Sequence, residues 1–257
     1  MNVLWVFAHP EQSSLSGSLL GEGVRALADA GHECCISDLY AMKWKATVDR
    51  DDFTDEADGR VVVTAAGKRA YKAGTLSADI RTEQDKLAWA DAVVLQFPLW
   101  WYGMPAILKG WFDRIFVKGY AYGVTDPQRP GRTLRYGEGK LAGKRALVIV
   151  TSGSPAAPLG PRGINGQLDQ ILFPLLHGTL WYTGMSVLPP VAVYGADRVS
   201  PQDYVAAAKL VRDRVATIGD TAPIPFRYQN GGDYDECLVL RPELDPGGSG
   251  LGVHDVR

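Results

Sequence analysis

Three consecutive aromatic residues, Trp100, Trp101 and Tyr102, are the first candidates for chemistry in this sequence. They follow an apolar run over 92–97 and precede a helical pattern over 106–116. Three neighbouring side chains cannot all point to one side of a regular element, so at least one should line a ligand or a subunit interface. In open α/β sheets, ligands bind at the carboxyl ends of the strands, which is where this loop falls. The pattern predicts a site for a flat aromatic ligand.

A second group of candidates follows the first apolar run of the chain, residues 2–8. His9 ends this run, and a serine-rich loop leads into a helix expected over 19–31. The free N–H groups and the dipole at a helix N-terminus attract anions, and serine hydroxyls can bind a phosphate. Neither GxGxxG nor GxxxxGK(S/T) is present, which excludes the Rossmann and P-loop patterns. The alternative is that His9 and the serines only cap local structure; the candidate serines are Ser13, Ser14, Ser16 and Ser18.

A third candidate site lies after the apolar run 145–150, where the chain reads Thr151-Ser152-Gly153-Ser154. Small side chains leave the backbone N–H groups of such a turn open to close approach by the edge of a ring. The turn falls at the carboxyl end of an expected strand, as the aromatic loop does. Its position is therefore suited to a ligand site of the same kind.

Five short apolar runs bounded by turn residues are interpreted as strands: 2–8, 33–38, 92–97, 145–150 and 187–194. Helical patterns alternate with them over 19–31, 76–89, 106–116, 167–178 and 200–218. This alternation predicts an α/β fold with a doubly wound, five-stranded parallel sheet and helices on both faces. We expect a catalytic domain over 1–220 and an irregular C-terminal extension over 221–257 that packs on the domain or on a dimer partner.

Composition excludes several classes of protein. The 257 residues carry a net charge of −2 and no long basic run, so we expect no nucleic acid partner. No apolar run approaches the ~20 residues needed to span a bilayer, and the N-terminus enters a strand without a signal peptide, so we expect no membrane insertion. Three cysteines without metal-binding spacing indicate reduced thiols in a cytoplasmic protein and no metal site; they are Cys34, Cys35 and Cys237.

The central motif QFPLWWYGMPAILKGWFDRIF, residues 96–116, resembles the signature of the NAD(P)H:quinone oxidoreductases, the DT-diaphorase family of flavodoxin-like flavoproteins. Further segments agree with that family: FAHPEQSSLSGSL at 7–19, SDLYAM at 37–42, AYKAGTLSADIRTEQDKL at 70–87 and TSG at 151–153. The resemblance covers residues 1–220. It implies a flavodoxin-like fold and an FAD-dependent enzyme.

The resemblance also implies a homodimer with two shared active sites and a ping-pong, two-electron reduction of quinones or related aromatic acceptors, with NAD(P)H as co-substrate. Hydride transfer between stacked rings depends chiefly on positioning. The residues implied to contact FAD are His9, Ser14, Leu15, Ser16, Ser18, Pro98, Leu99, Trp100, Trp101, Tyr102, Thr151, Ser152, Gly153 and Ser154. The residues implied to act on nicotinamide and quinone are Trp101, Tyr102, Gly153 and Asn165, with Tyr122 and Tyr182 closing over the pocket of the other subunit.

Four positions depart from the family pattern. Leu159 and Asn165 stand where the animal enzymes carry a tyrosine and a histidine proposed to relay charge. Val124 replaces a second lid tyrosine, and Val205 replaces an arginine near the adenine end of FAD. Leucine cannot donate a hydrogen bond, and asparagine does not titrate. The Leu159 and Asn165 replacements, together with the long connector over 123–140, keep open the alternative of a biosynthetic tailoring flavoprotein acting on a polycyclic aromatic intermediate. A further alternative is a regulatory subunit that senses redox state.

Overall fold

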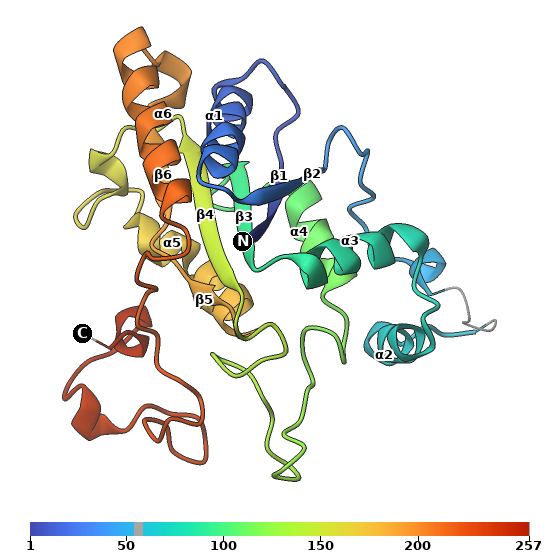
Figure 1. Ribbon diagram of the computed structural model, residues 1–257. Helices are drawn as coiled ribbons and strands as arrows, with labels where there is room; N and C mark the ends of the chain where they lie inside the picture. Colours follow the sequence, from blue (N-terminus) through green and yellow to red (C-terminus); the bar gives the residue numbers. More distant parts are fainter. Residues whose placement is uncertain (54–58, 257) are drawn as a thin grey trace.

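The computed structural model describes residues 1–53 and 59–256 and has a parallel sheet at its centre (Figure 1). The strands run in the order β2-β1-β3-β4, and β5 and β6 both pair with β4. Their bounds are β1 (Asn2–Phe7), β2 (Glu33–Asp38), β3 (Ala92–Pro98), β4 (Arg145–Ser152), β5 (Ser186–Val187) and β6 (Val191–Tyr194). All these pairs are parallel, so the carboxyl ends of β1, β3 and β4 meet at one edge of the sheet.

Helices cover both faces of the sheet (Figure 1). The α-helices are α1 (Leu15–Asp29), α2 (Val63–Ala73), α3 (Ala78–Trp89), α4 (Ala106–Ile115), α5 (Leu168–Leu175) and α6 (Pro201–Ala216). The short helical turns are η1 (Arg50–Asp52), η2 (Ala157–Leu159), η3 (Leu176–Trp181), η4 (Ala196–Arg198), η5 (Pro242–Leu244) and η6 (Leu251–His254). One core lies beneath α1 and α6, and a second lies beneath α3, α4 and α5. The expected doubly wound parallel fold is confirmed.

Strand β1 shows why the strand runs are apolar throughout. Val3, Trp5 and Phe7 enter the core beneath α1 and α6, whereas Leu4 and Val6 enter the core on the opposite face. Successive side chains of a strand point to opposite faces, and both faces are covered here. A strand buried on both faces therefore needs apolar residues at nearly every position.

The last strand departs from the expected continuous run over 187–194. It is divided into β5 and β6 by Leu188, Pro189 and Pro190, and the two pieces pair with different parts of β4. Proline has no N–H to donate to the ladder, so two consecutive prolines interrupt the pairing. The sheet therefore has six strands rather than five.

Helix α1 begins at Leu15 rather than at the expected residue 19. Ser14 is its N-cap, and the Ser14 Oγ accepts a hydrogen bond from the Gly17 N–H at 3.1 Å. Ser16 and Ser18 therefore lie inside the helix. Of the four candidate serines, Ser14 is the one that caps α1.

A buried ion pair fastens α4 to the loop before α2. The Arg114 Nη2 lies 2.8 Å from the Asp52 Oδ1, and each side chain is 1% exposed. The Arg114 Nη1 pairs with the Asp79 Oδ2 at 2.6 Å, and the guanidinium lies 4.5 Å from the centroid of the Trp44 ring. The Lys45 Nζ contacts the same Asp52 oxygen at 3.0 Å. Together these contacts hold residues 44–53 against the helix that follows the aromatic loop.

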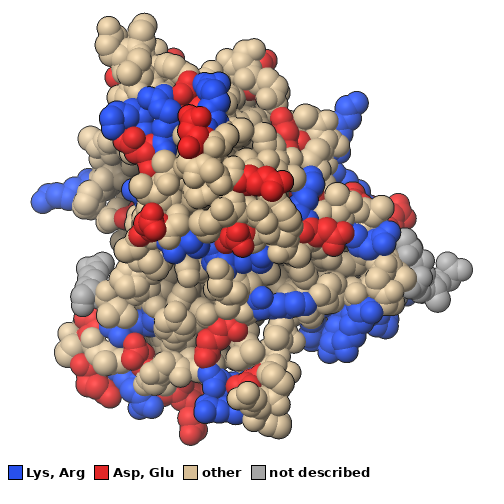
Figure 2. All heavy atoms as spheres, viewed as in Figure 1, with Lys and Arg blue, Asp and Glu red and all other residues tan. Residues whose placement is uncertain are grey.

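The residues after α6 form an extension that packs beside α5 and η3 (Figure 1). Phe226 is buried in the core, and the Trp181 Nε1–H donates to the Arg227 carbonyl at 3.2 Å. Figure 2 shows acidic and basic side chains interspersed over the face in view. Among the described residues, none of the helices combines the length and apolar character needed to cross a bilayer.

The three cysteines are free thiols within the described chain. Burial, with a smaller contribution from the adjacent Cys35, raises the pKa of Cys34 to about 11. Such a thiol is protonated at neutral pH and is a poor nucleophile. Residues 1–53 and 59–256 also contain no group of three or more histidine, cysteine or acidic side chains suited to a metal ion.

Candidate functional site

The aromatic loop forms a tight turn directly after β3. Trp100 and Gly103 donate backbone N–H hydrogen bonds to each other's carbonyl oxygens, both at 3.0 Å. Between them, Trp101 and Tyr102 have φ angles of +50° and +60°. Turns with two successive left-handed residues usually carry Asn or Gly, and other residues pay roughly 1–2 kcal/mol each for this conformation. The backbone is therefore strained at both aromatic positions.

Trp101 gains no burial within the chain to offset this strain. Its side chain is 98% exposed, so it covers almost no apolar surface of its own fold. Trp100 and Tyr102 are exposed as well. Strained backbone at exposed aromatic rings favours a surface that contacts a flat ligand or a partner subunit.

Asn165 connects the aromatic turn with the turn that follows β4. Its Oδ1 accepts a hydrogen bond from the Tyr102 hydroxyl, and its Nδ2 donates to the Ser154 Oγ, both at 3.2 Å. An amide accepts and donates at the same time, so Asn165 holds the Tyr102 ring without titrating. Leu159, the other departure at the relay positions, is buried in η2. Neither side chain can transfer a proton.

Hydrogen bonds tie together the loops after β1, β3 and β4. The Leu99 N–H donates to the Thr151 carbonyl at 2.8 Å, and the Thr151 and Ser16 hydroxyls lie 3.0 Å apart. The Gln96 Nε2 donates to the Ser16 carbonyl at 2.7 Å, while the Gln96 Oε1 accepts from the Trp5 Nε1–H at 2.9 Å. The structure thus brings the three predicted loops to one edge of the sheet.

Gln96 is absent from the site residues that the sequence pattern predicts, although it carries a usable signal. It is the one polar side chain in the strand AVVLQFP, and it is fully buried. A buried amide requires hydrogen-bond partners, and the ends of neighbouring strands can supply them. Gln96 is therefore a positioning residue for the first turn of α1. Pro98 and Ser152, the last residues of β3 and β4, are buried as well.

The loop between β1 and α1 presents the N-terminus of a helix of 15 residues. No acidic residue occupies the first turn of α1, so its side chains do not neutralise the positive end of the dipole. The His9 Nδ1 accepts a hydrogen bond from the Glu11 N–H at 3.1 Å, and the His9 and Trp100 ring centroids are 6.4 Å apart. Leu15 packs partly against the core beneath α1, and Ser18 is exposed. The dipole of α1 therefore favours an anion at this end of the helix.

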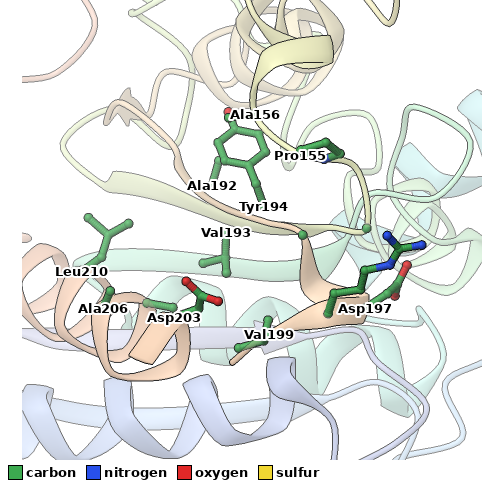
Figure 3. A pocket seen from close by; sticks show the side chains of 14 residues that line it. Pro155, Ala156, Ala192, Val193, Tyr194, Asp197, Val199, Asp203, Ala206 and Leu210 are labelled. Carbon is green, nitrogen blue, oxygen red and sulfur yellow. The ribbon is translucent and has the colours of Figure 1, made fainter. Parts of the chain in front are cut away.

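A cleft of about 760 Å³ adjoins the turn after β4 (Figure 3). Tyr194 and Pro155 line it on one side, and Leu210 of α6 lines it on the other. Gly153 borders both this cleft and the predicted ring-contact turn. A Cβ on Gly153 would lie 2.3 Å from the Asp197 Oδ2, so the carboxylate and a larger residue could not both keep their places.

A second aromatic group contains Tyr122 and Tyr182. Burial raises the pKa of Tyr122, and the nearby Tyr182 adds to the rise. The Tyr182 and Tyr136 rings meet edge to face with centroids 5.1 Å apart, and the Tyr136 N–H donates to the Tyr182 carbonyl at 3.0 Å. These contacts join the connector 117–144 to the end of η3. The place of Tyr122 and Tyr182 over a partner's pocket stays a prediction.

Known proteins resemble this chain over most of its length. A family model described as a flavodoxin-like fold matches residues 1–215. A ribosyldihydronicotinamide dehydrogenase-like protein of Penicillium crustosum is 44% identical over 257 residues, covering 99% of this chain and 95% of the relative. NAD(P)H dehydrogenase (quinone) 1 of Rattus norvegicus is 36% identical over 225 residues, covering 87% of this chain and 79% of the relative.

A solved structure gives the same relationship. A candidate quinone reductase from Klebsiella pneumoniae is 50% identical to this chain and superposes with a TM-score of 0.95. The match covers 99% of this chain and 99% of the Klebsiella chain. This match therefore continues past residue 215 into the C-terminal extension. The expected flavodoxin-like family is confirmed, and the names of the relatives agree with the expected oxidoreductase class. The chain belongs to the NAD(P)H:quinone oxidoreductase family of flavodoxin-like proteins.

Proposed function

We propose that this chain is an FAD-dependent NAD(P)H:quinone oxidoreductase that works by a ping-pong mechanism. NAD(P)H gives up a hydride, and a quinone or related aromatic acceptor gains two electrons and two protons, the second proton coming from solvent. The observation that carries the proposal is the strained turn that exposes Trp101 and Tyr102 beside the loops after β1 and β4. Bound flavin would supply the two-electron chemistry, and residues 1–220 would position it, with 221–257 as an extension.

The residues present fit a flavin that carries a diphosphate. His9 and residues 14–18, which are the end of the serine loop and the first turn of α1, would hold the diphosphate, and this first turn carries no acidic residue. Residues 98–102 would run along the ring system, and backbone N–H groups of 151–154 would meet its edge. The cleft beside Gly153 leaves room for a nucleotide.

Extraction of the flavin from purified protein tests the cofactor, and the absorbance of the bound flavin tests the activity. We expect chromatography to identify FAD. Under anaerobic conditions NADH or NADPH should bleach its absorbance, and a simple quinone should restore it. FMN alone would contradict the FAD assignment. Reduced flavin that simple quinones fail to reoxidise would favour the alternative of a tailoring reductase for a polycyclic aromatic substrate.

The strained turn leads to a prediction for Trp101→Gly. Glycine adopts this φ without strain, so the free energy of unfolding of flavin-free protein should stay within about 1 kcal/mol of wild type or rise. A stacked aromatic pair contributes roughly 0.5–1.5 kcal/mol, so kcat/KM for quinone reduction should fall up to about tenfold. Urea unfolding and steady-state kinetics measure the two effects.

Lys43→Gly is the matched control for Trp101→Gly. Lys43 also has a left-handed backbone, with φ +51°, but it carries no aromatic ring. We expect the free energy of unfolding of Lys43→Gly to change as it does in Trp101→Gly, because the same backbone strain is removed. Its kcat/KM should stay at the wild-type value. If Trp101→Gly also left kcat/KM unchanged, Trp101 would not belong to the site.

We propose a homodimer in which Tyr122 and Tyr182 of one subunit close over the pocket of the other. Two observations support it: the aromatic turn is uncovered within its own chain, and Tyr182 lies near enough to Tyr122 to add to the rise in its pKa. Obligate interfaces of this kind bury more than about 2,000 Å². Sedimentation velocity at assay concentration should find the dimer, and a fully active monomer would contradict it.

A further inference from the structure

The C-terminal extension helps to form a pocket that the proposed oxidoreductase site does not use. Its volume is about 290 Å³, and it lies between the connector, the α5–η3 segment and the extension. Its lining side chains are Arg135, Tyr136, Phe173, His177, Gln229, Tyr234, Leu238 and His254. A water molecule occupies about 30 Å³ of liquid, so the pocket has room for roughly ten waters or for a ligand of one or two rings.

Flat rings form one wall of this pocket. The Phe173 and His177 rings are stacked, with centroids 4.6 Å apart and planes inclined by 16°. The Tyr136 and His254 rings lie 4.9 and 5.3 Å from the His177 ring, each inclined by 30°. The Tyr234 hydroxyl and the His254 Nδ1 share a hydrogen bond of 2.9 Å, which continues the wall. A wall built of aromatic rings can make favourable contact with a planar aromatic ligand.

Two side chains, His177 and Arg135, offer hydrogen-bond donors to a ligand in this pocket. His177 is only 8% exposed, yet its Nε2 has no hydrogen-bond partner among the described residues. Burial, with a smaller contribution from His254, lowers the pKa of His177 to about 4, so the ring is neutral at neutral pH and has one N–H to donate. Arg135 adds a positive charge, and its Nε donates to the Gln229 Oε1. A buried ring nitrogen without a partner is uncommon in native proteins.

The backbone that presents His177 is also unusual. His177 lies in η3, a π-helical turn that directly follows α5, and Pro174 interrupts the last turn of that helix. Single π-helical turns are rare and occur frequently at functional sites. The π-helical turn is therefore a second, independent feature that points to a ligand beside His177.

We propose that this pocket, the extension pocket, binds a small planar aromatic anion, namely an aromatic carboxylate of one or two rings. The ligand ring would pack against the aromatic wall that contains Phe173 and His177, and its carboxylate would accept hydrogen bonds from Arg135 and His177. Tyr136 also contacts Tyr182, so the ligand would lie one ring away from a residue of the proposed lid. The pocket is lined by none of the residues assigned to the flavin, so its occupation does not depend on the proposed function.

Titration of the purified protein with 2-naphthoate tests the extension pocket. Isothermal titration calorimetry should show one ligand per chain, and the uncharged 2-naphthamide should bind at least about tenfold more weakly because it lacks the carboxylate. The titration is read directly as heat, so it stays valid if the protein proves to carry no flavin. Absence of 2-naphthoate binding at millimolar concentration would overturn the proposal.

Two substitutions locate the bound ligand. Arg135→Gln should weaken binding about tenfold or more, whereas Arg129→Gln, which removes the same charge from an exposed position of the connector, should leave it unchanged. His177→Phe keeps the ring stack, removes the unpartnered nitrogen and should weaken binding several-fold, with unfolding curves confirming that the variant folds. Unchanged affinity in both variants, with loss of binding in Trp101→Gly, would place the ligand at the proposed flavin site and overturn the proposal.

Discussion

Replacement of Arg114 by leucine is expected to lower the free energy of unfolding by about 3 kcal/mol. The substitution removes the buried partner of Asp52 and leaves the Lys45 Nζ, 3.0 Å away, to compensate the carboxylate. Breaking one side of a buried ion pair costs about 3–5 kcal/mol because the other charge stays in a poorly solvated environment. For a chain of this length the midpoint of thermal unfolding should fall by roughly 6–12 °C. Calorimetry and urea unfolding measure both quantities.

Lys109→Ala on the same helix is the control for Arg114→Leu. Its ion pair with Asp113 lies on the surface, with side chains 60% and 46% exposed, so its loss should change the free energy of unfolding by no more than about 1 kcal/mol. If the unpaired charge is the cause, the double variant Arg114→Met, Asp52→Leu should recover most of the loss. A change below about 1 kcal/mol in Arg114→Leu itself would show that the pair does not anchor residues 44–53.

Gly17→Ala is expected to disrupt the serine loop at the start of α1. A Cβ on Gly17 would lie 2.0 Å from the Gln12 carbonyl oxygen and 2.8 Å from its carbon, which are backbone atoms that cannot rotate away. Overpacking of this kind costs about 1–3 kcal/mol, and the loop must shift to relieve it. If this loop holds the flavin phosphates, flavin affinity should fall about tenfold or more. Fluorescence titration of flavin-free protein with FAD measures that change.

Gly21→Ala is the control one turn further along α1. The nearest atom to its added Cβ is the Arg25 Nη1 at 3.6 Å, the end of a flexible side chain, so the methyl group fits. Alanine favours helix more than glycine does, so this variant should be as stable as wild type or up to about 1 kcal/mol more stable, with unchanged flavin affinity. If Gly17→Ala bound FAD as tightly as Gly21→Ala, the serine loop would have no part in the site.

The alternation of apolar runs was sufficient to predict the doubly wound sheet and the edge at which the site forms. The runs 92–97 and 145–150 make up most of β3 and β4, which continue for one and two further residues. Parallel strands connected by helices bring their carboxyl ends to one edge, so the three loops meet whatever contacts their side chains make. The order of strands and helices along the chain is therefore enough to predict the parallel sheet and the edge where the three loops meet.

Element boundaries were harder to predict because several residues compete for one role. From the sequence, any of the candidate serines could cap α1. Ser14 is the N-cap because its Oγ accepts a hydrogen bond from the Gly17 N–H. Pro189 and Pro190 lie inside an apolar run that predicts one continuous strand. In the structure they divide that strand into β5 and β6. In both cases the residue types were informative, but the hydrogen bonds that decided between them form only in the folded chain.

The sequence by itself determined which residues gather at the sheet edge, whereas only the tertiary structure decided how they are held there. Local preference opposes left-handed φ at Trp101 and Tyr102, and the turn is held by the Trp100–Gly103 pair and by Asn165, which is distant in sequence. The stacking of His177 on His254 likewise joins η3 to the end of the extension. Spacing and periodicity describe neighbours along a helix or strand. Contacts between segments that are distant in sequence depend on how the packed elements meet, and these contacts can hold strained backbone in place.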